Sequence, residues 1–123
     1  MVDNRPAILI AEDQIFIALE AERILTEGFD CTVEICRRDQ LSDALAHKSF
    51  DIVVLEFAGN PGEDFHYGSL ARRSGAQMMF LTAADDLADV AEAFPDVPLV
   101  RKPFNDTDMR TYVERLLVGK RSG

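Results

Sequence analysis

The chain has 123 residues, of which 47% are hydrophobic and 28% are charged, a composition typical of one soluble globular domain and unlike that of a disordered segment. Its 22 acidic and 13 basic residues give a formal net charge of −9, which argues against a nucleic-acid-binding surface and against docking on an anionic membrane. No run approaches the roughly 18 apolar residues of a spanning helix, and the first residues lack the apolar core of a signal peptide, so we expect a cytoplasmic protein.

Short apolar runs alternate with amphipathic segments along the chain. Residues 7–11 form a continuous apolar run, typical of a strand buried on both faces. Apolar residues recur at helical spacing over 14–27, with Asp13 as the expected N-cap and Gly28 as the expected left-handed stop. The same patterns predict strands over 31–36, 52–55, 77–81 and 98–101, helices over 39–48, 65–74, 84–94 and from Asn105 to about 118, and a loop over 58–64.

Five strands and five helices in strict alternation predict a doubly wound α/β domain, (βα)5, with a five-stranded parallel sheet. We expect a single domain over residues 1–123, with its core over about 6–119. Ligands of such sheets bind beyond the carboxyl ends of the strands, so the residues at those ends are the first candidates for function.

The two cysteines and two histidines do not suggest a metal or redox site. Cys31 and Cys36 are five residues apart in one expected strand, a spacing that points them to opposite faces and makes a disulfide between them difficult. We expect both to be buried or half-buried structural residues. His47 and His66 lack the spacing of metal ligands, which argues against zinc and against a histidine-based triad.

The predicted strand ends bring carboxylates, a hydroxyl and an ammonium group together. Glu12 and Asp13 follow the first strand, Glu56 the third, Thr82 the fourth and Lys102 the fifth. Carboxylates this close need a cation among them, and Mg²⁺ suits oxygen ligands. Lysine and threonine would add the means to hold a phosphoryl group. Taken singly, each residue has an ordinary explanation, as a helix cap or a surface charge, but their joint occurrence favours a site.

With these residues in place, the chain resembles the receiver (CheY-like) domains of two-component response regulators over nearly its whole length. The stretches that carry the resemblance are Ile10-Ala11-Glu12-Asp13-Gln14, Asp51-Ile52-Val53-Val54-Leu55-Glu56, Phe80-Leu81-Thr82-Ala83 and Arg101-Lys102-Pro103-Phe104. The resemblance implies the flavodoxin-like arrangement of that family and a role in phosphorelay signalling.

The resemblance also implies a role for each matching residue. Glu12, Asp13 and the acceptor position, Glu56, would hold Mg²⁺ together with the main-chain carbonyl of Ala58. Lys102 would contact the phosphoryl group, Thr82 would move toward it, and the Lys102–Pro103 bond would be cis.

Three departures from the family pattern bear on function. The acceptor is a glutamate, whose extra methylene carries the carboxylate about 1.5 Å further into the pocket. We therefore expect impaired phosphorylation or a phospho-mimicking state, with Mg²⁺ binding weakened or altered. Pro61 comes one residue later than is common in the family, which puts the Ala58 ligand in question, and Leu99 stands where many receivers carry an aromatic residue.

We therefore expect a stand-alone receiver module that acts through protein contacts and is not an enzyme beyond phosphoryl acceptance. Its partners would be a histidine kinase or phosphotransfer protein and a downstream signalling protein, with a homodimer possible and no nucleic acid or membrane. Two alternatives are a small Mg²⁺-dependent phosphatase or phosphotransferase using the same acidic cluster and, less favoured, a flavodoxin-like cofactor binder. Candidate contact surfaces are Ile15, Phe16 and Leu19, and Leu99 with Tyr112, whereas the pairs Arg37-Arg38 and Arg72-Arg73 are expected to be solvated ends of elements.

Overall fold

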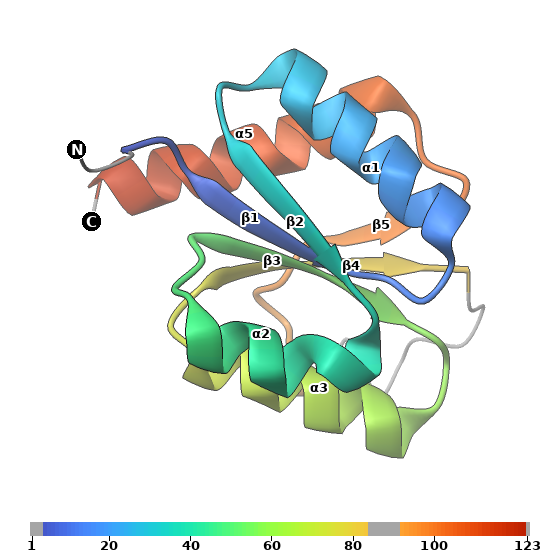
Figure 1. The fold of residues 1–123 in the computed structure, drawn as a ribbon. Helices are drawn as coiled ribbons and strands as arrows, with labels where there is room; N and C mark the ends of the chain where they lie inside the picture. The colour runs from blue at the N-terminus through green and yellow to red at the C-terminus, as the bar shows by residue number, and fades with distance from the viewer. Residues whose placement is uncertain (1–3, 84–91, 123) are drawn as a thin grey trace.

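The computed structural model describes residues 4–83 and 92–122, which form one parallel sheet between two layers of helices (Figure 1). The sheet order is β2-β1-β3-β4-β5, with β1 (Ala7–Ala11), β2 (Thr32–Cys36), β3 (Ile52–Phe57), β4 (Gln77–Thr82) and β5 (Leu99–Arg101). The helical segments are α1 (Ile15–Gly28), the 3-10 turn η1 (Arg38–Gln40), α2 (Leu41–His47), α3 (Pro61–Arg73) and α5 (Asp106–Ser122). The predicted five-stranded, doubly wound α/β fold is confirmed. Within the described ranges, no helix is long and apolar enough to cross a membrane.

Two hydrophobic cores lie on opposite faces of the sheet, since successive strand residues point to opposite faces. In β1, Ile8 and Ile10 join the core beneath α1 and α5, whereas Leu9 and Ala11 join the core beneath α2 and α3. Glu12 and Glu56 lie on the α1 and α5 face of the sheet, because each follows a residue of that core, Ile10 or Val54, by two positions. The alternation of strand side chains that builds the two cores therefore also directs both carboxylates to the same face of the sheet.

The main departures from the predicted boundaries surround the end of β3. This strand runs to Phe57, two residues beyond the predicted end, so Glu56 lies inside it. The prediction of a loop over 58–64 is wrong for its second half, because α3 already begins at Pro61. The side chain of Asn60 accepts the Glu63 N–H at 3.3 Å and caps the helix. Of the helix predicted over 84–94, residues 84–91 lie outside the described residues.

Both predicted ends of α1 require correction. The N-cap is Gln14, and the side chain of Asp13 accepts hydrogen bonds from Arg38 instead of capping the helix. Gly28 is the last helical residue and does not have a positive φ. The Arg110 side chain packs across this glycine, and a Cβ there would lie 2.6 Å from its Nε, so a larger residue would displace the arginine.

The cysteines are placed as predicted. Cys31 is buried, Cys36 is half-buried, and both are free thiols. Burial raises the pKa of Cys36 to about 11, and it also raises the pKa of Cys31. Both thiols are therefore protonated at neutral pH and are poor nucleophiles.

Gly68 provides a test of packing between α3 and the aromatic cluster of the second core. It is buried in α3, and a Cβ built on it would lie 2.6 Å from Cζ of Phe94, whose ring makes an edge contact with Phe80. Overpacking costs about 1–3 kcal/mol, whereas the gain in helix propensity is at most about 1 kcal/mol. We expect Gly68→Ala to lower the free energy of unfolding by about 1 kcal/mol, measured by urea denaturation.

Gly62→Ala is the matched control in the same helix. The nearest atom to its added Cβ is Oδ1 of Asn60 at 3.7 Å, an ordinary contact, so stability should be unchanged or raised by up to about 1 kcal/mol. A Gly68→Ala protein as stable as Gly62→Ala would contradict this account of the core.

Candidate functional site

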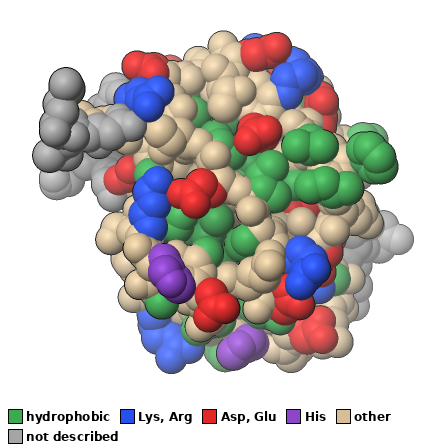
Figure 2. Space-filling model, viewed as in Figure 1, with side chains coloured by type: hydrophobic (Ala, Val, Ile, Leu, Met, Phe, Trp, Pro, Cys, Tyr) green, Lys and Arg blue, Asp and Glu red, His purple; other side chains and the backbone are tan. Residues whose placement is uncertain are grey.

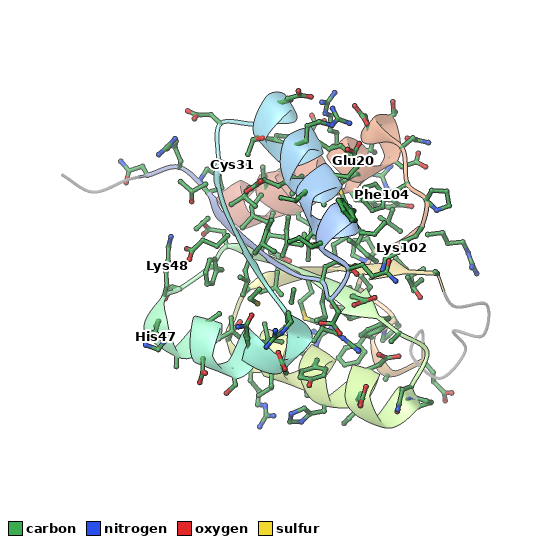
Figure 3. The ribbon with its side chains drawn as sticks, turned by 45° about the vertical axis from the view of Figure 1, so that its right-hand side comes forward. Glu20, Cys31, His47, Lys48, Lys102 and Phe104 are labelled. Carbon is green, nitrogen blue, oxygen red and sulfur yellow. The ribbon has the colours of Figure 1, made fainter. Side chains whose placement is uncertain are left out.

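The carboxyl ends of β1, β3 and β5 bring two glutamates and a lysine into direct contact. Nζ of Lys102 lies 3.0 Å from Oε1 and 2.8 Å from Oε2 of Glu12, and 3.0 Å from Oε2 of Glu56. Figure 3 shows Lys102 below the N-terminal end of α1, at the edge of the sheet where these strands end. The side chains of all three residues are less than a tenth exposed. One ammonium group therefore neutralises charge on two buried carboxylates.

Burial and hydrogen bonding act differently on the two glutamates. Burial raises the pKa of Glu12, even though Lys102 and the Gln14 N–H, 3.1 Å from its Oε1, oppose the shift. Burial also acts to raise the pKa of Glu56, but the Asp13 N–H at 3.0 Å from Oε1 and the Lys102 ammonium outweigh it, so the pKa of Glu56 is lowered. Glu56 is thus held as a carboxylate at neutral pH. Among the described residues, Glu12 Oε2 is a buried oxygen that accepts no well-directed hydrogen bond, and the nearby Lys102 charge compensates for it.

A second cation, Arg38, enters the cluster from the turn after β2. Its backbone N–H donates to Oδ1 of Asp13 at 2.9 Å, and its Nε donates to Oδ2 of the same carboxylate at 3.2 Å. Nε is also 3.7 Å from Oε1 of Glu56, and the guanidinium lies over the Tyr67 ring, 5.4 Å from its centroid. Only 10% of the Arg38 side chain is exposed. The prediction that Arg38 is a solvated end is wrong, because β2 ends at the same edge of the sheet as the carboxylates.

Asp64 connects Arg38 to the loop after β3. It is fully buried near the start of α3, and its carboxylate accepts the Ala58 N–H at 3.1 Å and the Gly59 N–H at 3.0 Å. Nη1 of Arg38 lies 3.4 Å from Oδ1 of Asp64. Gly59 has a φ of 91°, a conformation that favours glycine. The short loop is therefore held closed by a carboxylate that is itself paired with Arg38.

Thr82 and the Lys102–Pro103 bond complete the predicted constellation. Thr82 is fully buried at the end of β4, and its hydroxyl donates to the carbonyl oxygen of Phe57 at 2.9 Å. The Lys102–Pro103 peptide bond is cis, as the resemblance implied. A hydroxyl has one hydrogen to donate, so in this state the Thr82 proton is directed to the backbone of β3.

The donor set expected to hold Mg²⁺ does not fit such an ion in this arrangement. Lys102 and Gln14 face the oxygens of Glu12, and Arg38 faces both oxygens of Asp13. In the described part of the chain, no group of three or more acidic, histidine or cysteine side chains is arranged to hold a metal ion. The site therefore meets its need for positive charge with side chains.

The exposed apolar surface predicted at the start of α1 is present. Ile15, Phe16 and Leu19 are 53%, 84% and 46% exposed, and Figure 2 shows hydrophobic side chains gathered over that end of the helix. By contrast, Leu99 and Tyr112 are half-buried and pack against the two cores, so they contribute little to a contact surface.

Sequence reasoning missed two residues of this cluster, Arg38 and Asp64. The signal for Arg38 was available, since residues just after the second strand must reach the same sheet edge as those after the other strands. For Asp64 the signal was weaker. It lies two residues beyond a Pro-Gly pair, and acidic residues are common in the first turn of a helix, where they are usually solvent-exposed.

No protein-family model and no curated protein matches this sequence significantly. Solved structures match over nearly the whole chain. The signal receiver domain of an HD domain-containing protein from Pseudomonas fluorescens is 20% identical, with a TM-score of 0.79, covering 98% of this chain and 100% of that one. A response regulator receiver protein from Sinorhizobium medicae is 22% identical, with a TM-score of 0.78 and coverages of 93% and 95%. A CheY-like receiver domain protein from Methanospirillum hungatei is 19% identical, with a TM-score of 0.77 and coverages of 98% and 100%. The chain therefore has the receiver-domain (CheY-like) fold.

The central ammonium of the cluster is open to a direct test. Lys102→Met would leave Glu12 and Glu56 buried without their shared cation. Breaking a buried ion pair by removing one partner costs about 3–5 kcal/mol, and we expect a loss of that size in the free energy of unfolding by urea at neutral pH.

Lys48→Met is the matched control. Lys48 pairs with Glu34 at 2.8 Å, but both side chains are about half exposed, so the expected loss is below about 1 kcal/mol. Equal losses for the two lysine variants would show that the buried cluster does not depend on Lys102.

Proposed function

We propose that this protein is a receiver-type signalling module that acts through protein contacts and does not depend on phosphorylation of its acceptor position. The fold and the matching residues at the strand ends support the receiver role. The pairing of the Glu56 carboxylate with Lys102 and the Asp13 N–H supports independence from phosphorylation.

The observation that carries the proposal is that both oxygens of Glu56 already face cationic or N–H groups. Oε2 accepts from Lys102 at 3.0 Å, and Oε1 accepts the Asp13 N–H at 3.0 Å, with Nε of Arg38 at 3.7 Å. A nucleophile must present a free lone pair in line with the leaving group of the phosphodonor, and a misplacement of about 1 Å can cost about 10²-fold in rate. Glu56 is only 7% exposed, so approach from solvent is also restricted.

The contacts also support a partial resemblance to a phosphorylated state. Lys102, which by resemblance would contact a phosphoryl group, is instead occupied by Glu56 and Glu12. Thr82, which would move toward that group, donates to Phe57. A carboxylate has one charge and two oxygens, whereas a phosphoryl group has up to about two charges and three oxygens. Glu56 therefore binds Lys102 as a phosphoryl group would, but it leaves the Thr82 hydroxyl on the carbonyl oxygen of Phe57.

The partners would be those that the resemblance implies, a histidine kinase or phosphotransfer protein and a downstream signalling protein. No observation on the described residues favours the alternative of a Mg²⁺-dependent phosphatase, because its catalytic carboxylates would be those now paired with Lys102 and Arg38.

The proposal predicts that acetyl phosphate, supplied with Mg²⁺, leaves the protein unmodified. Glu56→Asp withdraws the carboxylate by about 1.5 Å from Lys102 and restores the acceptor type of the family. Over a period in which Glu56→Asp gains a phosphoryl group, we expect the wild-type protein to remain unmodified by intact mass, which corresponds to a rate at least about 10²-fold lower.

Glu56→Gln is the control, since it keeps the side-chain length but cannot form an acyl phosphate. Modification of wild-type protein at Glu56, at a rate similar to that of Glu56→Asp, would refute the proposal. Turnover of a small phosphoester that is lost in Glu56→Gln would favour the enzyme alternative.

A further inference from the structure

We infer that Arg38 is a built-in cation that takes the place of a divalent metal ion among the carboxylates of Asp13 and Glu56, here called the acidic pocket. The charges of this pocket are then balanced without Mg²⁺. The inference goes beyond the proposed function, because a module that is not phosphorylated could still bind a metal ion. It concerns the chemistry of the pocket itself.

The first argument is the number of carboxylates that Arg38 serves. Its Nε lies 3.2 Å from Asp13 and 3.7 Å from Glu56, and its two terminal nitrogens lie 3.7 Å from Glu63 and 3.4 Å from Asp64. These acidic residues come from the ends of β1 and β3 and from the first turn of α3. One guanidinium therefore contacts carboxylates on three separate elements, as a bound cation at this edge would.

The second argument is that both the backbone and the guanidinium group of Arg38 are held in place. Its backbone N–H and Nε bind the two oxygens of Asp13, and the guanidinium is covered by the Tyr67 ring. Its side chain is 10% exposed, whereas the side chain of its neighbour Arg37 is 63% exposed and pairs with Asp39 at the surface. A planar guanidinium suits this role, since its five N–H donors can serve several carboxylates at once.

The third argument concerns charge. Arginine keeps its proton in proteins, so this positive charge is permanent. Arg38 supplies one positive charge where a magnesium ion would supply two, which leaves the pocket more negative. A phosphoryl anion would meet a weaker attraction there, in agreement with the state of Glu56. Mg²⁺ would need to displace the guanidinium from Asp13 before it could bind.

The test measures metal binding directly. Mn²⁺, a paramagnetic substitute for Mg²⁺, is titrated into labelled protein while the amide signals of Asp13, Ala58 and Gly59 are followed by NMR, and melting temperatures are recorded in millimolar Mg²⁺ and in NaCl of equal ionic strength. For the wild-type protein, we expect no selective broadening of these amides and the same melting temperature in both salts.

Arg38→Ala should convert the pocket into a metal-dependent one. Without metal, its melting temperature should fall by about 5 °C or more, because the carboxylates lose their shared cation. Mg²⁺ at about 100 times its Kd should then raise the melting temperature by about 5–10 °C, and Mn²⁺ should broaden the three amides. Arg38→Met, which removes the charge but keeps an unbranched side chain of similar reach, serves if the alanine variant does not fold.

Arg37→Ala is the matched control and should behave as wild type. Selective broadening in the wild-type protein would overturn the inference, as would folded Arg38 variants that gain no metal binding. The wild-type titration decides the matter even if neither Arg38 variant folds. If the wild-type protein binds the ion while acetyl phosphate leaves Glu56 unmodified, the inference about Arg38 fails and the proposed function stands.

Discussion

The structure around the site depends on one constraint, namely that carboxylates gathered at a buried sheet edge must be matched by positive charge. All five strands are parallel, so their carboxyl ends meet at this edge. Glu12 and Glu56 are nearly buried there, and an isolated ionised carboxylate in such surroundings is strongly disfavoured. Lys102 and Arg38 meet this requirement from opposite sides of the sheet order, from β5 and from the turn after β2.

The pairing makes the site part of the framework of the fold. The Asp13 N–H reaches Glu56, the Asp13 carboxylate reaches Arg38, and Asp64 holds both Arg38 and the loop after β3. The connections after β1, β2 and β3 are thereby tied together by charged hydrogen bonds. Such bonds are stronger than neutral ones, but removal of either partner leaves a buried charge. A substitution that breaks one of these ion pairs should therefore both lower the free energy of unfolding and rearrange the remaining charged side chains of the site.

The fold and most of the site could be predicted from the sequence because their signals are local. Apolar runs such as 52–55 and the helical spacing in α1 identify the layers, and the positions just after the runs identify Glu12, Glu56 and Lys102. The arginine pair by itself suggested solvated side chains, and only its position just after the second strand indicated that Arg38 reaches the sheet edge of the carboxylates. The sheet order, with β2 beside β1, then places Arg38 next to Asp13. The stop at Gly28 was misassigned because α1 ends through an extended Phe29, without a left-handed residue, and a glycine near a helix end does not distinguish the two endings.

Glu56 and Arg38 are physically consistent with each other. The longer glutamate side chain extends about 1.5 Å further than an aspartate, which brings Oε2 to 3.0 Å from Lys102 and Oε1 to 3.7 Å from Nε of Arg38. A metal ion at this position would compete with both cations for the same oxygens. With the guanidinium in place, the glutamate gains a second cationic neighbour and needs no solvent-derived ion. The contacts of Glu56 and of Arg38 thus support the same state, in which the acceptor position is closed by the protein's own side chains.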